Sequence, residues 1–267
     1  MRPRLQPFGT DFGNGAVDAR YFQRDVEEPR YLAAKLPARY RIASGGPRED
    51  AAHAAVLDWL ARRLASERAD ASPSAPADAN DFAGRYAGIS AFVQEDLVVQ
   101  LRDPAPGTRG LRDRAIAVYV SVPSGWRPED ILGWSFQRIH APVPDFADDP
   151  AAAGSLVAAM VERGPYVRFV WTICADDVLD HHPDEGPRTR FGPGTRAGWL
   201  RIERQVTVPF PDVQASLFLI RTYLRPFASL SAGERSDLAR ALACLPESTA
   251  RYKGLAGGLP HAIALLG

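Results

Sequence analysis

The chain has 267 residues, which is enough for one large domain or two small ones with a sizeable core. Lysine plus arginine and aspartate plus glutamate each number 32, so the formal net charge is zero and the basic excess of a nucleic-acid-binding protein is missing. The start lacks the apolar run of a signal peptide, and no segment approaches the roughly 20 apolar residues of a membrane helix, so we expect a cytoplasmic protein without membrane contacts.

The N-terminal part, residues 1–80, is predicted to be helical. Its main helix is expected over residues 47–70, where apolar residues recur at helical spacing: Val56, Leu57, Leu60 and Leu64. The low-complexity, proline-bearing segment 71–80 is typical of an exposed loop. We do not interpret it as a domain boundary, because the part before it looks too small to fold alone. The sequence therefore predicts one domain over residues 1–267.

Strand patterns dominate the middle of the chain. Five segments are short apolar or alternating runs: 91–101, 115–122, 166–173, 199–208 and 215–224. The last two are separated by a turn, "FPDV", and should pair in antiparallel fashion. A helix is expected over residues 148–164 with Asp149 as its N-cap, and a capping box of Ser231 and Glu234 opens a C-terminal helix. This order predicts an α+β fold with a mainly antiparallel sheet and flanking helices.

His140 has the most distinctive surroundings of the five histidines. It follows Ile139 and precedes Pro142 and Pro144, which stiffen the backbone. A rigid segment that presents one neutral imidazole suits a metal or a haem iron. The alternative is a core histidine hydrogen-bonded to the backbone, and the local sequence alone favours that alternative. The others are expected to be solvated loop residues (His181 and His182), a surface or partly buried helix residue (His53) and a structural residue (His261).

Charged residues interrupt two strands that are otherwise largely apolar. Arg201, Glu203 and Arg204 lie in the first of them, and Arg221 lies in the second. Charges are costly in a core unless they are paired, so a solvated sheet face or a structural ion pair is the favoured interpretation. The functional alternative is that Glu203 lines a pocket on the concave side of the sheet. The hairpin could bring Glu203 near Arg221, although the pattern does not define the register.

The two cysteines, Cys174 and Cys244, have neither zinc spacing nor the four thiolates of a typical iron–sulfur cluster. Cys174 could offer a thiolate to haem, but a buried free cysteine is far commoner. The sequence has no dinucleotide-binding, Walker, nucleophile-elbow or covalent-haem motif. Any electrons that the protein uses must therefore come from elsewhere.

Six motifs occur in order after an earlier "VQEDLVV": "VPSGWRPEDILG", "IHAPVP", "GPYVRFVWTI", "RIERQ", "IRTYLRP" and "YKGL". Together they cover residues 90–255 and resemble the haem-dependent oxidative N-demethylase family. The resemblance implies a PAS-like sheet that holds haem b, in the oxygenase subunit of a larger assembly. In the family's reaction, O2 and electrons from NADPH, passed through partner flavin and iron–sulfur components, convert dimethylamine to methylamine and formaldehyde.

The resemblance also implies roles for individual residues. His140 becomes the leading proximal haem ligand, whose second ring nitrogen should donate to a carbonyl or a carboxylate. Glu203 becomes the distal carboxylate that attracts the cationic amine and accepts its proton. Arg221 could tune Glu203 or pair with a haem propionate. Three more residues are candidates for contacts with the cofactor, and the two aromatic ones are equally plausible in the core: Arg204, Tyr223 and Trp171.

Three alternatives stay open at this point. The protein could be a non-catalytic PAS-like haem sensor or carrier. It could also be an oxygenase of the same family that acts on a different amine in specialised metabolism, or a structural homologue that has lost haem. The presence of His140 and of the charged strand residues argues against the loss of haem.

Overall fold

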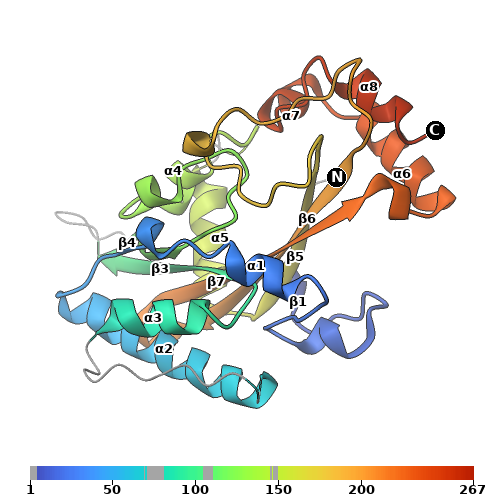
Figure 1. Ribbon diagram of the computed structural model, residues 1–267. Coiled ribbons are helices and arrows are strands. Elements are labelled where there is room, and N and C mark those ends of the chain that lie inside the picture. The colour runs from blue at the N-terminus through green and yellow to red at the C-terminus, as the bar shows by residue number, and fades with distance from the viewer. Residues whose placement is uncertain (1–4, 69, 71–80, 105–110, 145, 147–149) are drawn as a thin grey trace.

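The structure, a computed structural model, describes most of the chain: residues 5–68, 70, 81–104, 111–144, 146 and 150–267 (Figure 1). Among the described residues, seven strands form one sheet in the order β1-β5-β6-β7-β3-β4-β2, and each neighbouring pair is antiparallel. The strands are β1 (Gln6–Pro7), β2 (Arg41–Ile42), β3 (Asp96–Pro104), β4 (Leu111–Tyr119), β5 (Tyr166–Cys174), β6 (Trp199–Phe210) and β7 (Ala215–Pro226). The predicted α+β class with a mainly antiparallel sheet and flanking helices is confirmed.

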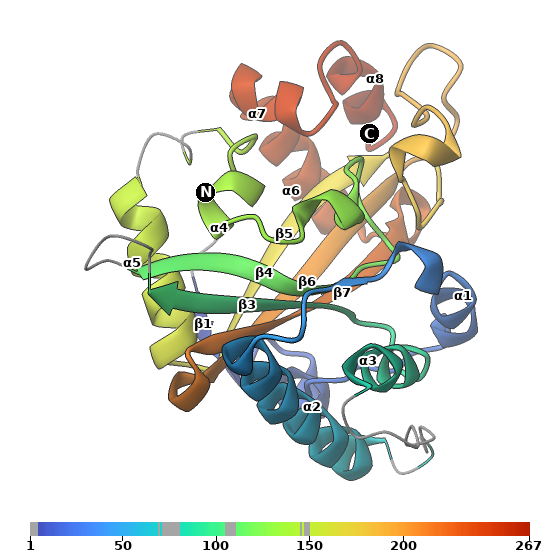
Figure 2. The same cartoon turned by 90° about the vertical axis from the view of Figure 1, so that its left-hand side faces the viewer.

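The helices cover both faces of this sheet. They are α1 (Glu28–Ala33), α2 (Pro47–Glu67), α3 (Phe82–Ser90), α4 (Phe136–Ile139), α5 (Pro150–Glu162), α6 (Ala232–Ala243), α7 (Glu247–Tyr252) and α8 (Leu259–Ala264). Helices α2 and α3 lie on one face, α4 and α5 lie on the other, and α6–α8 gather near the start of β6 (Figure 2). Among the described residues, no helix is both long and apolar enough to span a membrane.

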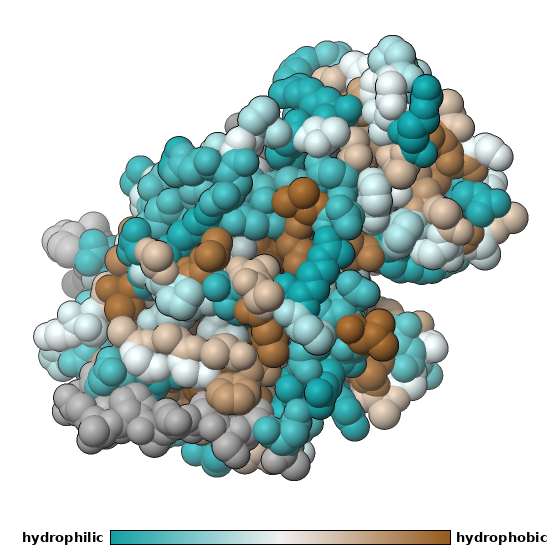
Figure 3. Space-filling model, viewed as in Figure 1, coloured by the Kyte–Doolittle hydropathy of each residue, from teal (hydrophilic) through white to brown (hydrophobic). Residues whose placement is uncertain are grey.

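The main hydrophobic core lies between the sheet and helices α2 and α3. Alternate residues of β6 and β7 point into it: Val206, Val208, Leu217 and Leu219. The apolar positions predicted for the long helix meet them there, and Leu57 and Leu60 are fully buried. Burying one such side chain contributes about 1.5–3 kcal/mol, so this core holds the sheet in place. The outer surface in Figure 3 is mostly hydrophilic, with its hydrophobic residues in separate patches.

Most predicted elements are present, with shifted ends. Helix α2 ends at Glu67 rather than at residue 70, and the capping box of Ser231 and Glu234 is confirmed. The strand expected from residue 91 begins at Asp96, because the chain turns after α3 before it enters the sheet. The predicted loop over residues 71–80 and the predicted N-cap Asp149 lie outside the described residues.

Strands β6 and β7 form the predicted antiparallel pair, and their register decides which face each charge occupies. The turn Pro211–Val213 joins them, and Gln214 closes it in the left-handed region with a φ of 53°. Glu203 lies opposite Thr222, and Arg204 lies opposite Arg221. Because successive side chains of a strand point to opposite faces, Glu203 lies on the side of α4 and α5, whereas both arginines lie on the side of α2 and α3. We call these sides the Glu203 face and the core face.

Candidate functional site

His140 follows directly after α4 and is half-buried beside two aromatic rings. Its ring centroid lies 4.0 Å from that of Phe136 and 5.4 Å from that of Phe146. The Nδ1 atom lies 2.8 Å from the backbone oxygen of Phe136, and Nε2 has no hydrogen-bond partner among the described residues. Burial lowers the pKa of His140 to about 4; the Phe136 carbonyl opposes the shift, and the positive charge of Arg168 adds to it. The ring is therefore neutral at pH 7, with Nδ1–H donated to the carbonyl and the Nε2 lone pair free.

Glu203 is connected to the same region through a short chain of hydrogen bonds. Arg168 donates from Nε to Oε1 of Gln205 over 2.7 Å, and Gln205 donates from Nε2 to Oε2 of Glu203 over 3.0 Å. The other carboxylate oxygen of Glu203 lies 3.8 Å from Nε of Arg201, whose terminal nitrogens donate to two backbone carbonyls. Since 3.8 Å is too long for a hydrogen bond, Oε1 keeps its lone pairs for another donor.

The end of α7 brings two more polar side chains to this place. Lys253 donates from Nζ to the backbone oxygen of Trp171. Burial lowers the pKa of Lys253, and the charge of Glu203 acts in the opposite direction. Partial enclosure of the hydroxyl group and the charge of Glu203 both raise the pKa of Tyr252, although 49% of this residue is exposed. We call the group that the structure assembles on and beside this face the Glu203 cluster: His140, Arg168, Glu203, Gln205 and Lys253.

Sequence reasoning did not select three members of the Glu203 cluster as site residues. Arg168 and Gln205 occupy polar positions in two alternating strands, and they are directly opposite each other in the β5–β6 register. Lys253 lies in the "YKGL" segment, far along the chain from both strands. The alternation of polar and apolar residues in β5 and β6 could have indicated Arg168 and Gln205. The position of Lys253 could not be predicted in this way, because it depends on how α7 packs.

Arg221 lies on the core face, and the expected contact with Glu203 is wrong. Its Nη2 atom is 2.6 Å from a carboxylate oxygen of Asp25. The guanidinium carbon lies 4.2 Å from the ring centroid of Tyr31 and 4.5 Å from that of Tyr223. The β6–β7 register is the physical reason, because it places Thr222 and not Arg221 beside Glu203.

Arg204 belongs to the same buried polar group on the core face. It donates to the backbone oxygen of Asp18 over 3.2 Å. Nearby Glu95 accepts from the backbone N–H of Gln23 over 2.8 Å; burial raises its pKa, and the charge of Arg221 opposes that shift. Arg204 and Arg221 are thus placed to hold the sheet to the N-terminal segments, away from His140.

Trp171 also points away from the Glu203 face. It shares the side of its strand with Ile173 and packs into the hydrophobic cluster formed with the C-terminal helices. The neighbouring Thr172 points the other way, and its buried hydroxyl has no partner among the described residues. Of the aromatic candidates, Trp171 therefore packs against the C-terminal cluster, and Tyr223 lies against Arg221 on the core face.

Three of the other four histidines are more buried than the sequence indicated. His53, expected at or near the surface, is fully buried and bonds through Nε2 to the oxygen of Ala43 over 2.8 Å. His181 and His182, expected to be solvated, are 6% and 1% exposed. The expectation was wrong because their loop folds under neighbouring segments, where His181 contacts Asp176 over 2.8 Å.

His182 lies in a group that could resemble a metal site. Ligand atoms of Glu129, His182 and Asp184 lie within 4.8 Å of one another. However, Nε2 of His182 lies 3.0 Å from Glu129, and its Nδ1 accepts from the backbone N–H of Asp184. Arg127 also forms two contacts with the Asp184 carboxylate. Both ring nitrogens and one carboxylate are already engaged, so this group is structural.

The chain matches the model of a known protein family. The family is described as haem-dependent oxidative N-demethylase, alpha subunit-like, and its model matches residues 30–259. The match therefore includes α4, both strands of the β6–β7 pair and all members of the Glu203 cluster.

The residues present fit a haem. A histidine ligand needs a neutral ring with one free nitrogen and a partner for the other, and His140 has both. A propionate needs an uncommitted cation, and the terminal nitrogens of Arg168 have no partner among the described residues. The aromatic rings of Phe136 and Phe146 supply apolar surface beside His140.

The state of His140 can be tested by NMR on protein expressed without haem precursor. We predict that its imidazole titrates near pH 4, because burial disfavours the charged form, whereas a free histidine titrates near 6.5. The resonance is assigned by its loss in His140→Gln, and denaturing the protein in urea should return its pKa to about 6.5. A value near 6.5 in the folded protein would contradict the enclosed, neutral ring.

Proposed function

The chain belongs to the haem-dependent oxidative N-demethylase, alpha subunit-like, family, and we propose that it removes a methyl group from a small secondary amine such as dimethylamine. The observation that supports this proposal is a single juxtaposition. Among the described residues, Nε2 of His140 and one oxygen of Glu203 have no hydrogen-bond partner; Arg168, whose charge acts on His140, is hydrogen-bonded through Gln205 to Glu203.

His140 and Arg168 are the residues that would hold the cofactor, haem b. His140 would ligate the iron through Nε2, while the hydrogen bond from Nδ1 to Phe136 fixes the tautomer and the ring orientation. Arg168 would pair with a propionate. When bound, the haem would supply the reduction of O2 and the transfer of one oxygen atom to the substrate, with electrons from NADPH delivered by flavin and iron–sulfur partner components.

Glu203 would bind and orient the amine. A dialkylamine is cationic at neutral pH, and the carboxylate compensates for the water that the ammonium loses on binding. Gln205 holds Oε2, which leaves Oε1 to accept the N–H and to take the proton. One C–H bond of a methyl group becomes C–OH, and the product collapses to methylamine and formaldehyde. The balance consumes one O2, two electrons and two protons, and it yields one water.

The roles of His140 and Glu203 can be separated by substitution. His140→Ala should purify without haem, and added imidazole should partly restore the Soret band by replacing the lost ligand. Glu203→Gln should keep its haem but release formaldehyde at least ~100-fold more slowly, the scale of a lost general base. Haem is measured as the pyridine haemochrome, and formaldehyde by a colorimetric assay.

The matched control is Glu247→Gln, because that carboxylate is 83% exposed and, within the described part of the chain, its ion pair is with Arg251 of its own helix. It should behave as the wild type. Normal formaldehyde release by Glu203→Gln would remove Glu203 from the reaction. A haem spectrum that no amine changes, with no formaldehyde released, would favour a haem sensor or carrier instead.

Two arginine substitutions distinguish the Glu203 face from the core face. Arg168→Met should weaken haem binding about 10-fold or more, since one charge-assisted hydrogen bond is worth about 1.5–3 kcal/mol. Arg221→Met should instead lower the free energy of unfolding by ~3 kcal/mol, because it leaves Asp25 and buried Glu95 without their cation. Haem titration and urea unfolding measure the two effects. If Arg221→Met weakened haem binding and Arg168→Met lowered the free energy of unfolding instead, the cofactor would lie on the core face.

A further inference from the structure

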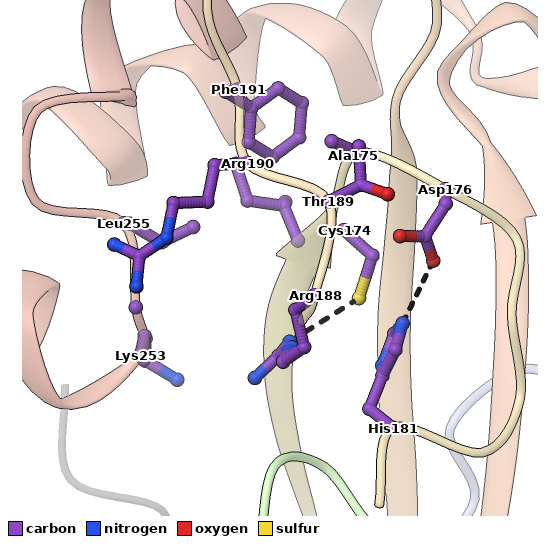
Figure 4. A pocket seen from close by; sticks show the side chains of 12 residues that line it. Cys174, Ala175, Asp176, His181, Arg188, Thr189, Arg190, Phe191, Lys253 and Leu255 are labelled. Atoms are coloured by element: carbon purple, nitrogen blue, oxygen red, sulfur yellow. Dashed lines mark hydrogen bonds and ion pairs between the residues drawn. The ribbon is translucent and has the colours of Figure 1, made fainter. Parts of the chain in front are cut away.

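A small basic pocket lies at the end of β5, next to the Glu203 cluster. Its volume is about 60 Å³, and its walls come from the end of β5, the loop that follows, and the residues after α7 (Figure 4). One water needs roughly 10–15 Å³ on this scale, so the pocket has room for a few waters or one small polar group. The residues that matter here are Cys174, Asp176, His181, Arg188, Arg190 and Lys253.

Three cations line this pocket, and none of them has an ion pair among the described residues. Arg188 makes only long contacts, 3.5 Å to the backbone oxygen of Ser124 and 3.8 Å to Sγ of Cys174. Arg190 is exposed, and no hydrogen-bond partner is found for it within the described ranges. Lys253 reaches only the backbone oxygen and the ring of Trp171. Such a concentration of positive charge is favourable when an anion is present.

One carboxylate, that of Asp176, lies in the pocket wall and offsets only one of the three positive charges. Its Oδ1 accepts from Nε2 of His181 over 2.8 Å (Figure 4) and from the backbone N–H of Val178 over 3.1 Å, and Thr189 hydrogen-bonds to the same carboxylate. His181 is only 6% exposed, and its other nitrogen, Nδ1, is buried without a partner in the part of the chain that the structure describes. Because Nε2–H is donated to Asp176 and burial lowers the pKa of His181, the ring is neutral and Nδ1 is an acceptor, which a water molecule in the pocket can satisfy.

We propose that this pocket binds one small oxyanion of the carboxylate or phosphate class. The two guanidinium groups and the ammonium donate charge-assisted hydrogen bonds to its oxygens. The anion is either free in solution or a propionate of a bound haem, because the two share the same chemistry. In both cases the ligand is an anion, in contrast to the cationic amine assigned to Glu203.

The test is calorimetric titration of the full chain with inorganic phosphate at pH 7 and constant ionic strength, on protein prepared with and without haem. We expect saturable binding with one site per chain. Arg188→Met and Arg190→Met should each weaken it about 10-fold, since each removes one charge-assisted hydrogen bond. Arg190 is exposed, so its replacement leaves folding intact; thermal melts check Arg188→Met. Arg196→Met is the matched control, because Arg196 is an exposed arginine of the same loop and does not line this pocket.

The outcomes distinguish the two possible sources of the anion, and they also show whether the proposal is wrong. Binding with and without haem supports a site for a free oxyanion. Binding only without haem supports a propionate subsite, because the cofactor then occupies the pocket. No saturable binding in either form, or an equal loss in Arg196→Met, overturns the proposal. None of these results depends on amine turnover, so the N-demethylation proposal can fail separately.

Discussion

The alternation of side chains along β6 is the constraint on which the candidate site depends. Glu203 and Arg204 are neighbours in the chain, yet the strand sends one to the Glu203 face and the other to the core face. A slip of one residue in the β6–β7 register would exchange them and bury an acid where an arginine now lies. The apolar residues Val206 and Val208 prevent such a slip, because the same shift would expose them.

The two faces use buried charge differently. On the core face, Arg221 is paired with Asp25 and enclosed by tyrosine rings, so its charge is compensated within the protein. Polar atoms without a partner among the described residues occur on both faces. On the core face they are Nε of Arg204, Nε of Arg221 and one carboxylate oxygen of Glu95; on the Glu203 face they are Nε2 of His140, the terminal nitrogens of Arg168 and the hydroxyl of Thr172. We propose the Glu203 face for the cofactor and the substrate because it carries a neutral imidazole and, in Arg168, a cation without an ion pair among the described residues.

The local parts of this structure could be predicted from the sequence, and the long-range parts could not. Strands β5, β6 and β7 follow from alternation, and the capping box of Ser231 and Glu234 involves residues three apart. To predict the face on which Arg221 lies, one must know the β6–β7 register, which depends on a short turn and on one residue in the left-handed region, Gln214. The burial of His181 and His182 depends on how their loop packs, and no periodic pattern in the sequence predicts the packing of a loop. The roles of His140 and Glu203 came from resemblance to a family.

The most direct test of the shared face is electron–nuclear double resonance on the ferric, haem-loaded protein with deuterated dimethylamine. The account predicts hyperfine coupling to a histidine nitrogen, which is lost in His140→Ala. It also predicts deuteron couplings from the amine methyl groups, which are lost in Glu203→Gln while the histidine coupling remains. Two results would contradict the claim that His140 and Glu203 contribute to one reaction site. One is a wild-type spectrum without deuteron coupling, and the other is a Glu203→Gln spectrum that is identical to that of the wild type.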